Sequence, residues 1–397
     1  MKKRILFIES GQGYGGSSKY LIDLFKYLNK ERYEPCLAYY RPGLNFDLIR
    51  EAGYRTFDLR VKEFPVLNDT GTRGNGDTGK VTASPRHRFA LLQYLLFTAL
   101  PAAFRLAALI KRERVDLLHL NNEILTHLPG ILAGQLTGTP VVVHFQGFRK
   151  LTRLEKMFGK WPRACFALSH AGAKLFSDEL GREVMPLHHA VDLETYAPEK
   201  YQGKQDLRER FRGSRLIGLV GRLVSWKGQD IFLQSAKEVL KKYPDAKFLL
   251  IGDDPDPEKK FRKVLQKMAW DYGIQDQVVF MGWQNEIPTL VSQLDIFVHA
   301  STEPEAFGIV IIEAMAMKKP AIATNAGGVP ELIEHGVSGF LIPPSEPKPM
   351  TEAICALLED PKKAAQIGER ARQRVETMFD IRQNAAKVEN LYQELLP

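Results

Sequence analysis

The sequence predicts an α/β protein built from two doubly wound parallel-sheet domains, and three observations carry this prediction. The chain has 397 residues, more than one hydrophobic core usually serves. Short β-prone apolar runs alternate with amphipathic helical stretches, as in the βαβ units of a parallel sheet. The alternation starts again after Pro198. We therefore expect domains over residues 1–198 and 199–380, and a closing helix over 381–397 that can pack back on the first.

The elements of the first half follow from this alternation. Strands are expected at RILFIES, PCLAYY, VDLLHL and PVVVHF, and helices over Tyr20–Asn29 and near Leu48. Residues 68–80 are rich in Gly, Asn, Asp and Thr and predict a mobile loop or an insertion. The polar, turn-forming segment from Asp192 to Gln205 is the expected linker.

The second half repeats the pattern. Its predicted strands are RLIGLVGRL, AKFLLIGD, QVVFMGW and LDIFVHAS. Its predicted helices cover Asp230–Tyr243 and Glu258–Tyr272, and two more begin near Phe307 and near Pro330.

Composition narrows the class of protein. The three cysteines lie far apart with no CxxC spacing, which favours a reducing compartment over a disulfide framework or a zinc site. The N-terminal apolar run is too short for a signal peptide, so we expect a cytoplasmic protein. The net charge is +9 over residues 1–200 and −1 over residues 201–397. An anionic partner for the first half and ordinary solubility both fit this split.

Residues 89–110, FALLQYLLFTALPAAFRLAALI, approach the length of a membrane span. Pro101, Arg105 and the basic flanks disfavour a span. A buried helix leading into VDLLHL and a helix at a membrane interface both remain open. The flanking basic residues are Arg86, Arg88, Lys111, Arg112 and Arg114.

A glycine-rich turn follows the first strand. Gly11, Gly13 and Gly16 form GxGxxG, which lets backbone amides approach a diphosphate at a helix N-terminus. A nicotinamide-binding domain would place an acidic residue at the end of the second strand, but Arg41 stands there. The sequence therefore argues against a nicotinamide oxidoreductase.

Two stretches of the second half carry the chemistry of an anion site. LVGRLVSWKGQD places Arg222 and Lys227 after a strand end, where two cations can neutralise a diphosphate, although such residues are often only solvated. EPEAFGIVIIEAMA places Glu305 before a helix whose first amides can bind an anion. Glu313 lies inside that helix in apolar surroundings, where a carboxylate needs a ligand or a partner. Capping and solubility are the alternative roles of the two acids.

GRLVSWKG, EPEAFGIVIIEAMA, TNAGGVPELIEHGVSGFLIPP and the N-terminal glycine loop together resemble the retaining nucleotide-sugar glycosyltransferases of family four, which have the GT-B fold. The resemblance covers nearly the whole chain and is densest over residues 218–344. It implies that the second domain binds the donor, that the first binds the acceptor, and that the chemistry takes place in the cleft between them.

The resemblance also implies roles for particular residues. Arg222 and Lys227 match the cations that bind the donor diphosphate, Glu305 the carboxylate facing the donor sugar, and Glu313 the one holding the ribose. The remaining donor-site residues match the family's backbone contacts to base, sugar and phosphate: Gly15, Gly16, Met281, Trp283, Phe307, Gly308 and Ile309.

One departure concerns histidine. Members of the family often carry a His two residues further on than His144, where this chain has Gln146. Either His144 acts instead as a catalytic residue, or the family's His contact is absent. His119 is a second candidate, and a structural imidazole is the alternative for each.

The expected reaction is transfer of a sugar, with retention, from a UDP-sugar more readily than a GDP-sugar to an acceptor hydroxyl. The UDP preference rests on family frequency, and the acceptor is expected to be a lipid-linked or cell-surface glycan precursor, as in polysaccharide or lipopolysaccharide biosynthesis. We expect no cofactor, no metal and no nucleic acid, and docking of the first domain on the inner face of an anionic membrane. A GT-B epimerase and a non-catalytic nucleotide-sugar binding protein are the alternatives.

One motif points to a metal. Asp254 and Asp256 spell the DxD of metal-dependent glycosyltransferases, but the Pro-rich loop around them is typical of a turn.

Overall fold

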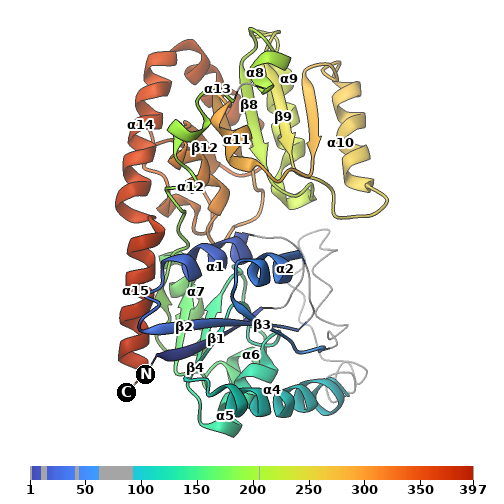
Figure 1. Cartoon of the computed structure of the whole chain (residues 1–397). Helices are drawn as coiled ribbons and strands as arrows, with labels where there is room; N and C mark the ends of the chain where they lie inside the picture. Colours follow the sequence, from blue (N-terminus) through green and yellow to red (C-terminus); the bar gives the residue numbers. More distant parts are fainter. Residues whose placement is uncertain (1, 10–15, 41–43, 62–92, 205, 397) are drawn as a thin grey trace. The chain divides into compact units, whose positions relative to one another are not determined.

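The protein is described by a computed structural model that covers residues 2–9, 16–40, 44–61, 93–204 and 206–396 (Figure 1). The chain forms two compact units. Residues 1–168, 173–187 and 385–397 belong to the first unit, and residues 169–172 and 188–384 belong to the second. The expected loop at residues 68–80 lies outside the described residues.

The first unit contains a seven-stranded parallel sheet with the order β3-β2-β1-β4-β5-β6-β7. Its strands are β1 Lys3–Glu9, β2 Tyr33–Tyr39, β3 Arg55–Asp58, β4 Leu117–Leu120, β5 Val141–Phe145, β6 Ala164–Ala167 and β7 Met185–Pro186. Helices α1 (Gly16–Tyr27) and α2 (Leu44–Glu51) lie along one face, and α4 (Leu100–Glu113) and α5 (Leu128–Thr137) lie along the other (Figure 1). The remaining helices are η2 Leu95–Ala99, α6 Arg153–Phe158 and α7 His170–Leu180.

The second unit contains a six-stranded parallel sheet with the order β10-β9-β8-β11-β12-β13. Its strands are β8 Leu216–Val220, β9 Lys247–Ile251, β10 Val278–Gly282, β11 Ile296–His299, β12 Ala321–Thr324 and β13 Phe340–Ile342. Its helices are η3 Pro198–Tyr201, α8 Asp206–Arg210, η4 Ser225–Lys227, α9 Gln229–Val239, α10 Lys260–Asp271, α11 Ile287–Ser292, α12 Ile309–Ala316, η5 Val329–Glu331, α13 Pro347–Glu359 and α14 Pro361–Met378. The two parallel sheets with their helices confirm the predicted fold class.

Two sequence expectations need correction. The helix expected near Pro330 is only the single 3-10 turn η5. The expected linker is partly folded into the second unit, because Tyr196 is fully buried there and Asp192 caps the turn around it.

The last helix, α15 (Ile381–Leu395), crosses from one unit to the other along the chain, and its residues from Ala385 onward belong to the first. Tyr392 is buried there, with its hydroxyl 2.7 Å from His119 Nδ1 and its ring packed against Tyr33. The backbone amide of Asn29 donates to Glu389 at 2.6 Å. The core of the first unit is therefore completed by the end of the chain.

The segment expected to form one helix over residues 89–110 consists, in its described part, of a π-helical turn, η2, followed by α4. One face of α4 is buried through Ala103, Leu106 and Ile110. Large apolar side chains are exposed on both elements, with Phe97 of η2 77% and Phe104 of α4 61% accessible. Among the helices in the described ranges, none combines the length and the hydrophobicity that crossing a membrane requires.

Candidate active site

The turn after β8 holds the two predicted cations. Arg222 is exposed, and its carbonyl accepts a hydrogen bond from buried Gln229 at 2.8 Å. Gly228 ends η4 with φ 69°, and a Cβ built there would lie 2.0 Å from the carbonyl oxygen of Ala300. Only glycine allows this close approach, which brings Lys227 to the segment that follows β11.

Lys227 and Glu305 form one cluster with two residues that the sequence analysis did not select. Glu305 Oε1 accepts from Lys227 Nζ at 2.6 Å and from His299 Nε2 at 2.7 Å, and the Ser301 hydroxyl donates to the same oxygen. His299 is buried at the carboxyl end of β11. Its Nδ1 lies 3.5 Å from the Thr324 hydroxyl at the end of β12.

The electrostatics of this cluster favour an ionised Glu305. Burial alone would raise the pKa of the Glu305 carboxyl, but His299 and Lys227 outweigh burial and hold that pKa well below its usual range. Lys227 also lies 4.5 Å above the Trp226 ring, a cation–π contact that holds the ammonium beside the carboxylate.

The backbone around Glu305 is held by a glycine pair. Glu305 forms a parallel bridge with Gly327, and its carbonyl accepts from the Gly328 amide at 2.8 Å. Gly327 has φ 64°, and a Cβ there would lie 2.1 Å from the Glu305 carbonyl oxygen. Only glycine allows this close approach, which holds the backbone of Glu305 ahead of α12.

Helix α12 presents its N-terminus directly after this loop. Gly308 is its N-cap, in the left-handed region at φ 96°, and Ile309 is its first residue. The first amides of a helix lack intrahelical acceptors and carry the positive end of the dipole. Phe307 is buried against the rings of His188 and His189. Anion-binding amides are therefore available a few residues from the Glu305 carboxylate.

The other predicted donor residues lie as follows. Glu313 is buried inside α12, as its apolar neighbours in sequence suggest. Met281 is in β10, and its carbonyl accepts from Gln284 at 2.7 Å. Trp283 is exposed, with its Nε1 donating to Asn285 at 3.0 Å. Gly16 begins α1, and Gly15 lies outside the described residues.

The two candidate histidines of the first unit are buried in its core. His144 is inaccessible, its Nε2 donates to the Leu187 carbonyl at 3.0 Å, and burial lowers its pKa to about 4. His119 bonds to Tyr392, and burial lowers its pKa well below its usual value. This burial contradicts the expectation that His144 meets a substrate, and both rings have structural contacts instead. Gln146 follows β5 and donates to Asn121 at 2.8 Å.

The DxD carboxylates make local turn contacts. Asp254 accepts from the amide of Asp256 at 2.8 Å and from the amide of Arg262 at 3.0 Å. Asp256 in turn accepts from the amide of Glu258 at 2.9 Å. These bonds order the loop that precedes α10.

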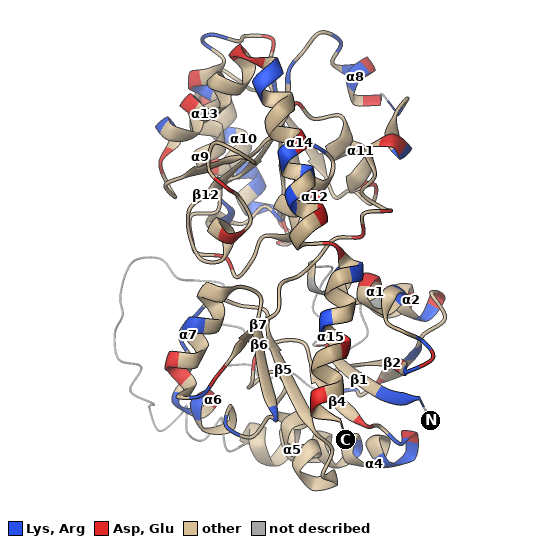
Figure 2. Cartoon of the chain, turned by 90° about the vertical axis from the view of Figure 1, so that its left-hand side faces the viewer, with Lys and Arg blue, Asp and Glu red and all other residues tan. Residues whose placement is uncertain are grey.

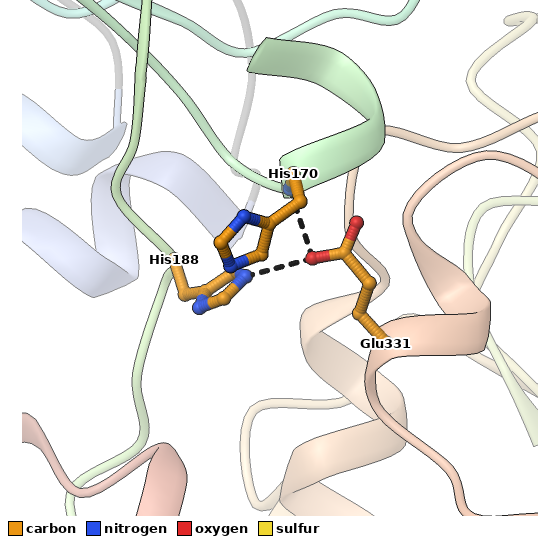
Figure 3. A group of neighbouring side chains, drawn as sticks. All are labelled: His170, His188 and Glu331. Carbon is orange, nitrogen blue, oxygen red and sulfur yellow. Dashed lines mark hydrogen bonds and ion pairs between the residues drawn. The ribbon is translucent and has the colours of Figure 1, made fainter. Parts of the chain in front are cut away.

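One group of metal-ligating type is found among the described residues, formed by His170, His188 and Glu331 (Figure 3). Glu331 accepts from the amides of His170 and Ala171 at 2.9 and 2.8 Å, and from His188 Nε2 at 2.9 Å. The carboxylate therefore caps the N-terminus of α7, whose first residues, 170–172, belong to the second unit. Burial would raise the pKa of Glu331, but these hydrogen bonds lower it.

His299 and Ser301 are the residues that sequence reasoning missed. A signal was present, because His299 ends the apolar strand run LDIFVHAS, and ligands of open parallel sheets bind at carboxyl strand ends. Nothing in the sequence indicated that its partner would be Glu305.

Comparisons with known proteins identify the family of the chain. The family described as "Glycosyl transferases group 1" matches residues 204–374, and the one described as "Glycosyl transferase 4-like domain" matches residues 15–182. The chain is 28% identical over 331 residues to N-acetyl-alpha-D-glucosaminyl L-malate synthase of Bacillus anthracis, covering 78% of this chain and 84% of that protein.

Two further similarities are informative. The chain is 26% identical over 309 residues to the UDP-Gal:alpha-D-GlcNAc-diphosphoundecaprenol alpha-1,3-galactosyltransferase of Escherichia coli, covering 72% of this chain and 78% of that one. The crystal structure of Anabaena HepE in complex with UDP and glucose superposes with a TM-score of 0.80 at 24% identity, over 99% of this chain and 100% of that chain. The chain is therefore an enzyme, a glycosyltransferase of the family-four type with the GT-B fold.

Proposed function

We propose that the protein transfers a sugar from a UDP-sugar to an acceptor hydroxyl with retention of the anomeric configuration. The observation that carries the proposal is the cluster of Lys227, Glu305 and His299 beside the N-terminus of α12. Cations and helix amides at one point suit a leaving diphosphate, whose developing charge they stabilise. The Anabaena structures similar to this chain hold UDP or UDP-glucose, which supports uridine as the base.

The proposed roles of the residues are those that the family resemblance implies. Arg222 and Lys227 bind the diphosphate together with the amides of Gly308 and Ile309, and Glu305 faces the donor sugar. The leaving phosphate itself takes the acceptor's proton, so the proposed mechanism needs no general base, and His144 has no part in it.

A thermal-shift screen with UDP, GDP, ADP and their sugars tests the donor, because a ligand that binds only the folded state raises its stability. We expect UDP compounds to raise the Tm and the others not to. Transfer to an acceptor is then followed by NMR of the anomeric proton, which distinguishes retention from inversion. Product formed from the donor alone would support an epimerase, and binding with no turnover would support a non-catalytic binding protein.

We further propose a lipid-linked or cell-surface glycan precursor as the acceptor, met at an anionic membrane surface. The exposed face of η2 and α4 supports this, because it combines the apolar side chains of Leu96, Phe97 and Phe104 with exposed Arg105 and the basic residues at the end of the helix. Charged residues gather toward one end of α4, and the remainder of the helix is mostly uncharged (Figure 2). Apolar side chains next to cations suit the interface of an anionic membrane. The Escherichia coli relative, named for a diphosphoundecaprenol acceptor, agrees with a lipid-linked substrate.

A further inference from the structure

A single carboxylate oxygen, Glu305 Oε1, accepts hydrogen bonds from three side chains. The donors are Lys227 Nζ, His299 Nε2 and the Ser301 hydroxyl. An ionised carboxylate only accepts, so His299 carries a proton on Nε2. The side chains of Lys227, His299 and Glu305 are 16%, 3% and 13% exposed, so water screens these contacts only weakly.

Lys227 has two anions to neutralise in the proposed function. Without donor it is bound to Glu305 at 2.6 Å. A bound diphosphate carries more charge than a carboxylate and draws the same ammonium toward itself. A carboxylate that stays buried while its cation turns away is strongly destabilised.

His299 is the group able to compensate for that loss. Its Nε2–H already points at Glu305, and an imidazole changes charge near neutral pH. The described groups around the pair are charged Lys227 from η4, uncharged Ser301 from the loop after β11, and uncharged Thr324 from β12. Among the residues that the structure describes, Lys227 is the permanent cation that contacts Glu305, and His299 adds a second positive charge only when its ring is protonated.

We propose that His299 replaces Lys227 as the cation beside Glu305 when the donor diphosphate binds, and that it takes up one proton in doing so. The proton comes from solvent and adds to Nδ1, while Nε2–H keeps its hydrogen bond to Glu305. The Thr324 hydroxyl, 3.5 Å from Nδ1, turns from donor to acceptor. His299 is then a positioning residue that keeps Glu305 ionised and in place. The inference rests on the proposed function, which assigns Lys227 to the diphosphate.

The first test needs no ligand. Lys227→Met removes the ammonium and imitates its departure from Glu305. We expect NMR titration of the histidine rings to show a higher pKa for His299 in this variant than in the wild type, with the His299 signal assigned by its loss in His299→Gln. A matched Lys241→Met change, in the turn after α9, should leave that pKa unchanged, because Lys241 pairs with exposed Glu238. An unchanged His299 pKa in Lys227→Met would overturn the inference.

The second test uses UDP-glucose. Calorimetry in buffers of different ionisation enthalpy measures the protons taken up on binding. At a pH where His299 is neutral in the free protein, the wild type should take up close to one proton, and its affinity should fall by up to about tenfold per pH unit. His299→Gln keeps an N–H donor but does not ionise, so its uptake should vanish and its affinity should become independent of pH. A purely structural His299 would leave proton uptake equal in both proteins, which overturns the proposal.

The two tests separate the inference from the donor assignment. If UDP-glucose fails to bind, the donor carries another sugar or another base, and the titration of Lys227→Met still decides whether the His299 pKa rises when the lysine is lost. If UDP-glucose binds with equal proton uptake in the wild type and in His299→Gln, the donor stands and the role of His299 is wrong.

Discussion

Lys227 and Arg222 differ in their surroundings although the sequence pairs them. Lys227 is tied to Glu305 and Trp226, whereas the Arg222 side chain is exposed. Each is proposed to stabilise the leaving diphosphate, and removing one such group typically costs ~10²-fold or more in rate. We expect Arg222→Ala and Lys227→Ala each to lower kcat/KM by at least about this factor with the donor that the thermal-shift screen identifies.

The matched control for these variants is Lys241→Ala, which removes an exposed lysine from the same unit. Circular dichroism should show that all three variants are folded. Near-normal turnover of both Arg222→Ala and Lys227→Ala would contradict the diphosphate assignment.

Glu305 also links the site to stability. Its pKa is lowered in the folded state from a reference value of 4.5, so its contribution is complete above about pH 4.5 and is lost as the pH falls further. We expect Glu305→Gln to lower the free energy of unfolding at pH 6, and the difference from the wild type to shrink by pH 3.5. Urea denaturation at both pH values measures this.

Glu352→Gln, at an exposed position on α13, serves as the control for this effect and should change little at either pH. If the gap between the wild type and Glu305→Gln were as large at pH 3.5 as at pH 6, the ionised state assigned to Glu305 would be wrong.

At the scale of elements, the exposed face of η2 and α4 yields a prediction about membranes. Phe104→Ser or the pair Lys111→Gln and Arg112→Gln should reduce co-sedimentation with anionic vesicles, because apolar burial and electrostatic attraction act together at the interface. Each basic residue contributes about 1 kcal/mol near an anionic surface. Binding should also weaken as salt rises.

Trp270→Ser provides the control for this surface, since Trp270 is 70% exposed on α10 in the second unit and should not affect vesicle binding. A wild-type protein that ignores anionic vesicles at low salt and glycosylates a soluble sugar efficiently would exclude the membrane proposal and leave the transferase untouched.

For the whole molecule, we predict activity in excess EDTA. The proposed mechanism assigns the charge of the leaving group to Arg222, Lys227 and the amides of α12. EDTA already saturated with magnesium controls for effects of the chelator itself. Activity that disappears on chelation and returns with manganese would instead assign a metal to the DxD loop at Asp254 and Asp256.

The sequence predicts the fold class well because the alternation of strand and helix is a local pattern. It places α10 and α15 to within about two residues of their observed ends. It raises the packing of the closing helix on the first domain but leaves the choice between the two domains open, because that choice depends on which surface Tyr392 meets. The prediction of a helix beginning near Pro330 was wrong for a related reason, because contacts distant in sequence decide the local structure there, and the chain forms only the 3-10 turn η5.

The candidate site was partly predictable. Lys227 and Glu305 were selected from their neighbours in sequence and from the family resemblance, and they do meet. His144 was chosen because it lies two residues before Gln146, which stands where members of the family often carry a His. That position does not reveal burial, and the ring lies in the core. His299 was missed because a histidine in an apolar run is normally interpreted as a structural residue, and the sequence does not show that its partner is Glu305.

The position of Tyr392 has a consequence for biosynthesis. A ribosome releases residues in order, so β1 and β4 emerge long before the helix whose Tyr392 covers His119. The nascent N-terminal sheet must wait, with one side of its core uncovered, until the intervening unit has been translated. A nonsense codon near the 3′ end of the gene would therefore destabilise the N-terminal unit, the part of the enzyme that is translated first.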